Sequence, residues 1–97
     1  MKLHPGFEAE YKRRHAAIWP GLAALLRDTG IMEYSIFLDE ASLVLFATLR
    51  IADPARLDEL PAHPVMREWW DHMKDLMVTH ADHSPVVIPL KEVFYLP

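Results

Sequence analysis

Cysteine is absent from this 97-residue chain, and only three glycines are present. The lack of cysteine excludes disulfide bonds, thiolate metal sites and a cysteine nucleophile. Three glycines are too few for the loops that cradle phosphates, and no Walker motif, dinucleotide fingerprint or GxSxG elbow occurs. No carboxylate pair typical of glycoside hydrolases is visible either. Phosphoryl transfer and nucleotide-dependent redox chemistry are therefore disfavoured.

Positive charge and long apolar runs are also scarce. The formal net charge is −4, and the basic run Lys12-Arg13-Arg14 is explained by a solvated helix face, so nucleic-acid binding is not expected. No apolar run approaches the about 20 residues of a membrane span, and the N-terminus lacks the apolar core of a signal peptide. We expect one domain over residues 1–97, located in the cytoplasm.

The first half of the chain predicts one helix and two strands. Apolar and aromatic residues recur every three or four positions over residues 7–29, and Pro20 is predicted to kink or break this helix. Gly30 is a suitable stop. Alternating patterns then predict strands over residues 32–38 and 43–51, joined by a hairpin loop.

The second half predicts two more helices and a strand. Asp53 and Pro54 are typical of a helix N-terminus, here of a short helix ending near Pro61. A longer helix is expected over residues 64–77. After a loop, residues 86–96 predict a last strand, interrupted at Pro89.

With a very short strand at residues 1–3, the order is β, α, β, β, α, β. This order indicates an α+β fold of the ferredoxin-like split βαβ type, an antiparallel sheet with helices on one face. The bare face of such a sheet needs a cover. A second copy of the chain would supply it, so we expect a dimeric α+β barrel.

The candidate site begins on the first helix. Tyr11, His15 and Trp19 are spaced one turn apart, which predicts a wall of three rings with polar tips. The alternative is structural: two aromatic rings in the core and a buried histidine with its hydrogen bonds satisfied. Spacing alone slightly favours this alternative.

Trp69, Trp70 and Tyr34 are further candidates. Adjacent helical residues point about 100° apart, so one tryptophan can enter the core while the other faces a cleft or a partner. Each of the three also has a structural interpretation as a core or interface residue. Together with Tyr11 and His15 they have the composition of a sugar site. A histidine with its usual pKa of about 6.5 has both protonation states available near neutral pH, which suits acid–base chemistry on a sugar.

The remaining histidines carry weaker signals. His80 and His83 flank Asp82 on an apparent loop without further ligands at fixed spacing, so no metal site is predicted. His63 and His72 are interpreted as solvated or capping residues. No cofactor is implied by any motif.

Several segments resemble the L-rhamnose mutarotase family. EYKRRHAAIWP in the first helix resembles the family's EY-x-RRH-x-x-IWP segment. The likeness continues in register through YSIFLD, LFA, REWWDHM and DHSPV to EVFYLP at the end of the chain. The combination of His–IWP, the tryptophan pair and the FYLP-like ending is specific.

The resemblance implies a cytoplasmic homodimer of ferredoxin-like subunits that interconverts the anomers of L-rhamnose without a cofactor. It assigns His15 as proton donor and Tyr11, Tyr34, Trp69 and Trp70 to substrate binding. The first strand, residues 1–3, is shorter than in the family. Fold analogy leaves a cofactor-independent monooxygenase open, and a small-ligand-binding dimer is the non-enzymatic alternative.

Overall fold

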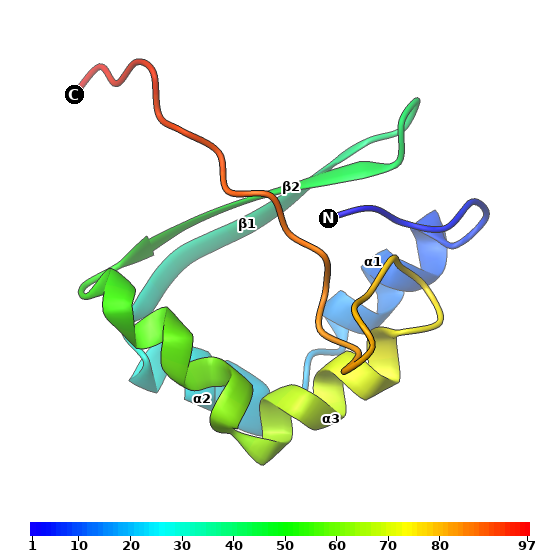
Figure 1. Cartoon of the computed structure of the whole chain (residues 1–97), viewed down its shortest axis with the longest axis horizontal. Coiled ribbons are helices and arrows are strands. Elements are labelled where there is room, and N and C mark those ends of the chain that lie inside the picture. The colour runs from blue at the N-terminus through cyan, green and yellow to red at the C-terminus, as the bar shows by residue number, and fades with distance from the viewer.

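The computed structural model describes all 97 residues as an α+β arrangement of three helices, one 3₁₀ segment and two strands. The strands form a long twisted ribbon on one side, and the helices lie together on the other (Figure 1). The elements in chain order are α1 (Glu8–Ala16), α2 (Pro20–Asp28), β1 (Ile31–Asp39), β2 (Val44–Ile51), η1 (Pro54–Ala62) and α3 (Pro64–Met73).

The helix predicted over residues 7–29 is broken at Pro20, as expected. Trp19 adopts an extended backbone, ψ 133°, which is the usual conformation of a residue before proline. α1 therefore ends at Ala16, and Pro20 occupies the first turn of α2, where a missing N–H costs nothing. α2 gives way after Thr29 to Gly30, which has the left-handed φ of 94° that glycine tolerates.

β1 and β2 pair antiparallel, and their register contains one bulge. Met32 lies opposite Arg50 and Ser35 opposite Thr48, so Glu33 and Tyr34 together face Leu49. Glu33 has the left-handed φ of 51°. An extra residue reverses the alternation of faces, because side chains in a strand point to opposite sides in turn.

The second half of the chain follows the prediction in kind but not in length. Asp53 caps η1 by accepting a hydrogen bond from the backbone N–H of Ala55 at 3.1 Å. The short helix is a 3₁₀ helix rather than an α-helix. α3 begins at Pro64 as expected but ends at Met73, four residues before the predicted end.

The predicted last strand is wrong for the isolated chain. No strand is present in residues 86–97, although Thr79 bridges Pro85 and the Val86 N–H reaches the Val78 carbonyl. The segment crosses the strand ribbon and then runs away from the body to the C-terminus (Figure 1). Beyond Val86 the segment makes no backbone hydrogen bond within the chain, so no ladder forms. We call residues 86–97 the C-terminal arm.

The first strand is present only as isolated bridges. Lys2 pairs antiparallel with Val44, and Leu3 pairs antiparallel with Met77. The N-terminus thus lies between the start of β2 and the segment that follows α3. The regular sheet itself has two strands.

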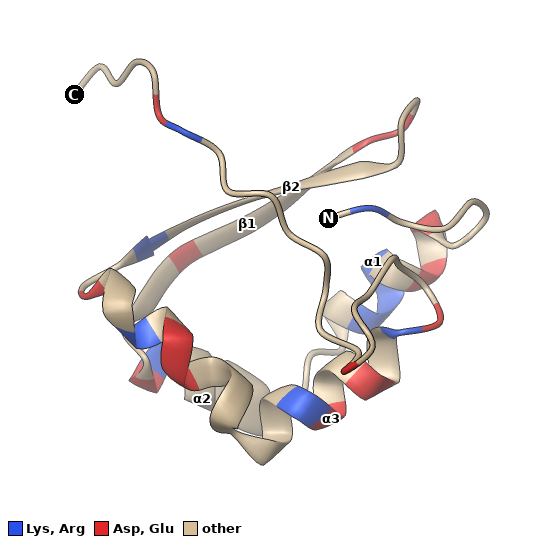
Figure 2. Ribbon diagram, in the orientation of Figure 1, with Lys and Arg blue, Asp and Glu red and all other residues tan.

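The core lies between the helices and the inner side of these strands. Leu3, Leu22 and Leu76 are its most deeply buried side chains, and they come from the N-terminus, α2 and the turn after α3. Charged residues occur on each of the three helices and near the strand ends (Figure 2). None of the helices is long and apolar enough to cross a membrane.

Candidate functional site

A small cavity of about 80 Å³, open to solvent on one side, lies between the helices and β1. Most of its lining is apolar or aromatic, with a few polar groups. The lining residues are Met1, Tyr11, His15, Tyr34, Ile36, Met66, Trp69, Trp70, Met73, Met77, His83 and Pro85.

α1 contributes Tyr11 and His15, which lie one helical turn apart on its inner face. Their ring centroids are 4.3 Å apart, with the ring planes tilted by 33°. The Nδ1 atom of His15 lies 3.1 Å from the backbone carbonyl oxygen of Tyr11. Because a carbonyl only accepts, Nδ1 carries the hydrogen, and Nε2 of the neutral ring is left as an acceptor.

Burial sets the protonation of both side chains. Loss of hydration lowers the pKa of His15, and its bond to the Tyr11 carbonyl opposes this only in part. The ring is therefore neutral near pH 7. Burial and the nearby Tyr34 phenol raise the pKa of Tyr11, so its hydroxyl stays protonated and acts as a hydrogen-bond donor or acceptor.

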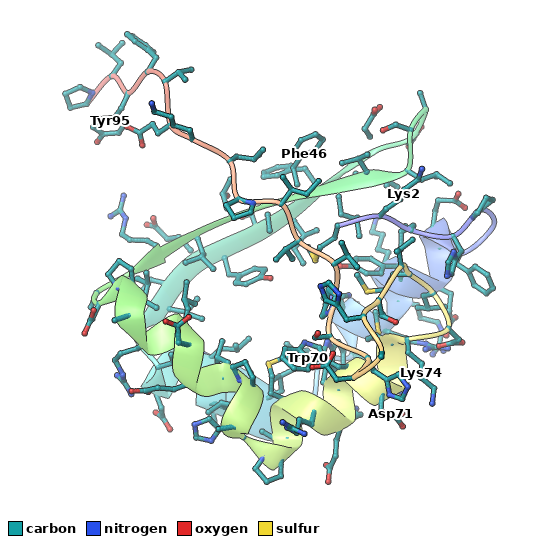
Figure 3. All side chains as sticks on the ribbon, in the orientation of Figure 1. Lys2, Phe46, Trp70, Asp71, Lys74 and Tyr95 are labelled. Atoms are coloured by element: carbon teal, nitrogen blue, oxygen red, sulfur yellow. The ribbon has the colours of Figure 1, made fainter.

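Trp69 and Trp70 line the cavity from α3. Trp69 is 6% exposed and meets the His15 ring edge to face, with centroids 5.4 Å apart and an interplanar angle of 87°. Trp70 is only half-buried, and Figure 3 shows it on the inner side of α3, facing the space between the helices and the strands. Trp69 is thus the more buried of the two, and both rings reach the cavity.

Tyr34 reaches the cavity because of the bulge in β1. Without the extra residue, the face that carries the buried Ile31 would continue through Glu33 and Ser35. With it, that face continues through Tyr34 and Ile36, which both line the cavity. Partial burial of the phenol raises the pKa of Tyr34, so this hydroxyl is also protonated.

Arg14 fixes α1 against the end of α3. Its guanidinium donates to the His72 carbonyl at 2.6 Å and to both carboxylate oxygens of Asp75, while Nε bonds Glu10. Arg13 and Arg14 lower the pKa of Glu10 to about 2, so this carboxylate stays charged. The network holds the helix that carries Tyr11 and His15 at a fixed distance from Trp69.

All five predicted site residues thus lie at one cavity, and their roles stay predictions. Trp19, expected as the third ring of the wall, is not among the lining residues. It packs edge to face on Trp69 at 5.1 Å because α1 stops before reaching it. His72 is exposed, as expected of a solvated residue, and its ring also lies beside the rings of Trp19 and Trp69.

Sequence reasoning missed His83 as a lining residue. The signal is weak, because a histidine within the polar turn DHSP suggests at most a metal ligand. No group of three or more His, Asp or Glu side chains is arranged to hold a metal ion.

Fold and cavity together define a small α+β protein with a histidine set among aromatic rings, a combination suited to a carbohydrate. The family model for L-rhamnose mutarotase matches residues 1–96. The L-rhamnose mutarotase of Rhizobium meliloti is 56% identical over 96 residues, covering 99% of this chain and 92% of the relative. That of Brucella anthropi is 53% identical over 97 residues, covering 100% and 92%.

A solved structure gives the same result. The crystal structure of L-rhamnose mutarotase from Formosa agariphila matches with a TM-score of 0.93 and 44% identity, covering 100% of this chain and 93% of that one. The chain belongs to the L-rhamnose mutarotase family. The predicted family and the predicted enzyme class, a carbohydrate isomerase that interconverts anomers, are confirmed.

Proposed function

We propose that this chain exchanges the anomers of L-rhamnopyranose in the cavity described above, with His15 as the proton-transfer residue. The observation that carries the proposal is the His15 ring, which lies half-buried among aromatic side chains at the cavity with Nδ1 bound to a carbonyl and Nε2 free.

The chemistry follows from this geometry. Neutral Nε2 takes the proton from the anomeric hydroxyl, the bond between C1 and the ring oxygen breaks, and the ring oxygen takes a proton from a second donor or water. The resulting aldehyde rotates about the C1–C2 bond. On closure the ring hydroxyl attacks the other face of C1 and loses its proton, and His15 returns its own proton to O1. His15 is thus the base in ring opening and the donor in ring closure.

Substrate binding falls to the remaining predicted residues. The faces of Trp69 and Trp70 offer flat apolar surfaces to the C–H side of a pyranose, and aromatic rings combine such surfaces with a polar edge. Tyr11 and Tyr34, both protonated, hydrogen-bond the sugar hydroxyls from two different elements. The apolar walls exclude water from the reacting atoms and strengthen these bonds.

The test is anomer exchange of L-rhamnose measured by saturation-transfer NMR. His15→Asn keeps an amide donor for the Tyr11 carbonyl but cannot take up a proton. We expect kcat to fall by about 10²–10⁴-fold. His4→Asn, at an exposed histidine outside the cavity, is the matched control and should exchange at the original rate. Undiminished exchange in His15→Asn would contradict the proposal.

We further propose that two chains assemble into the dimeric α+β barrel expected of a split βαβ fold. The N-terminal bridges already place residues 1–3 between β2 and Met77, the order that this fold requires. The C-terminal arm leaves an open groove of about 710 Å³ beside β2, lined mainly by apolar side chains. A second copy is the occupant we assign to this groove. Cytoplasmic location stays a prediction from the resemblance.

A further inference from the structure

His83 is the second histidine at the cavity that contains His15. It belongs to the turn that follows α3, far in the sequence from Tyr11 and Tyr34. Its side chain is 42% exposed, so it stands where the cavity meets solvent. A sugar entering the cavity has access to this ring.

The backbone holds His83 in one place. Its N–H donates to the His80 carbonyl at 2.9 Å, and the His80 N–H donates to the Ser84 carbonyl at 2.8 Å. The Asp82 carboxylate accepts from both the N–H and the hydroxyl of Ser84. His83 itself has the left-handed φ of 69°, which a histidine adopts at a cost. Such conformations persist where the surroundings fix them, and they gather at functional sites.

Asp71 on α3 orients the ring. Its Oδ1 lies 3.1 Å from Nδ1 of His83 and 2.8 Å from the Lys74 ammonium, and Figure 3 shows Asp71 and Lys74 close together at the end of α3. The Lys74 ammonium holds the pKa of Asp71 below its usual range, so the carboxylate is ionised. An ionised carboxylate only accepts, so Nδ1 carries the hydrogen. Nε2 makes no hydrogen bond within the chain.

We propose that His83, held by Asp71, is a further sugar-binding residue that accepts a hydrogen bond at Nε2 from a hydroxyl of the bound pyranose. This role rests on the proposed function. It differs from that of His15, because His83 binds the sugar before and after ring opening alike. An interaction made equally in the ground and transition states lowers KM and leaves kcat unchanged.

The test is His83→Gly, which removes the ring and suits the left-handed backbone. Loss of one hydrogen bond of ordinary strength predicts a rise in KM for L-rhamnose of about 5- to 10-fold, with kcat within about twofold of the original. His80→Gly is the matched control in the same turn. His80 is exposed, lies outside the cavity lining and bonds through its backbone alone, so its KM should not change.

Asp71→Asn provides a second variant that leaves the turn sequence intact. If Asp71 acts only by orienting His83, this change raises KM by a smaller factor and adds nothing in the His83→Gly background. Lys74→Met, which removes the other partner of Asp71, controls for the loss of that ion pair and should leave KM unchanged. If Asp71 has a merely structural role, the changes in KM caused by Asp71→Asn and His83→Gly add up in the double variant instead.

The outcomes separate the two proposals. If wild type exchanges anomers, His15→Asn does not, and His83→Gly has an unchanged KM, the sugar contact is wrong and the proposed function stands. A fall in kcat with unchanged KM also overturns the binding role, in favour of proton transfer by His83. If His15→Asn exchanges at the wild-type rate, the proposed mechanism fails independently of His83.

Discussion

The helical half of the molecule and the C-terminal arm contain similar apolar side chains in opposite surroundings. Leu76, Met73 and Trp69 are almost fully buried between the helices and the strands. In the arm, Val93 is 90% exposed, and Phe94 and Leu96 are little less so. Figure 3 shows Tyr95 near the end of the arm, well separated from Trp70 and the body.

This difference shows which part of the chain buries its apolar side chains without a second molecule. The buried half has enough internal partners to build both a core and a cavity. The arm contains several apolar residues in succession that have no internal partner. Large contiguous apolar surfaces are rare on proteins that act alone. Lys91 and Glu92 are the charged residues along it (Figure 2). The composition of the arm therefore supports the proposed homodimer, with a second copy supplying what the single chain lacks.

The largest loss of stability is expected for a substitution in the core, where side chains are most deeply buried. Leu76 is 0% exposed and packs among side chains from the N-terminus and the helices. Leu76→Ala should lower the free energy of unfolding by about 2–5 kcal/mol, because it removes apolar contacts and leaves a cavity. Urea denaturation followed by tryptophan fluorescence measures this. A loss below 1 kcal/mol would show that the core repacks freely around this position.

The next effect concerns the arm. Phe94→Asp places a charge where the proposed partner would bury an aromatic ring. We expect the dimer dissociation constant to rise at least tenfold, about 1.4 kcal/mol, with the unfolding of the separated monomer unchanged. Analytical ultracentrifugation over a concentration series measures the association.

Phe7→Asp, at a phenylalanine exposed elsewhere on the molecule, is the control for a charge introduced on the surface. Equal dissociation constants for the Phe94 variant and the wild type would remove the arm from the interface. A wild-type chain that stays monomeric at every concentration would overturn the homodimer itself.

Prediction from sequence succeeded where the cause is local. The break at Pro20, the stop at Gly30 and the cap at Asp53 follow from one or two residues each, and the structure has all three. The stripe of Tyr11 and His15 follows from helical spacing. These features need no knowledge of the rest of the chain.

Prediction failed where the cause lies in another segment. The arm has a strand-like pattern, but a strand also needs backbone pairing with a neighbouring segment, and beyond Val86 the arm makes none within the chain. The bulge at Glu33 and Tyr34 depends on pairing with Leu49, so alternation in β1 alone did not indicate it. His83 reaches the cavity only because the turn after α3 folds back over Asp71. Local spacing does not contain this information.

The smallest predicted effect is the pH dependence that His15 gives to stability. Burial lowers its pKa in the folded chain below the value of about 6.5 that the unfolded chain retains. Between these two values the unfolded state binds more protons, so stability rises with pH through this window. The contribution of His15 is therefore fully present above pH 6.5 and is lost as the pH falls through the window.

His15→Asn removes a titrating group and should flatten this part of the stability profile. Thermal unfolding followed by circular dichroism between pH 4.5 and 7.5 measures the slope. Ser35→Asn, at an exposed strand position that does not titrate, is the control and should keep the wild-type slope. The Glu10 carboxylate, with a pKa near 2 in the folded chain and about 4.5 in the unfolded one, adds slope at the acid end of this range. It does so in the wild type and in His15→Asn alike, so the difference between the two slopes reports His15. An unchanged slope in His15→Asn would mean that the ring is as well hydrated in the folded chain as in the unfolded one. Burial would then not lower the pKa of His15, and the proposed ring opening would lack the reason for a neutral base.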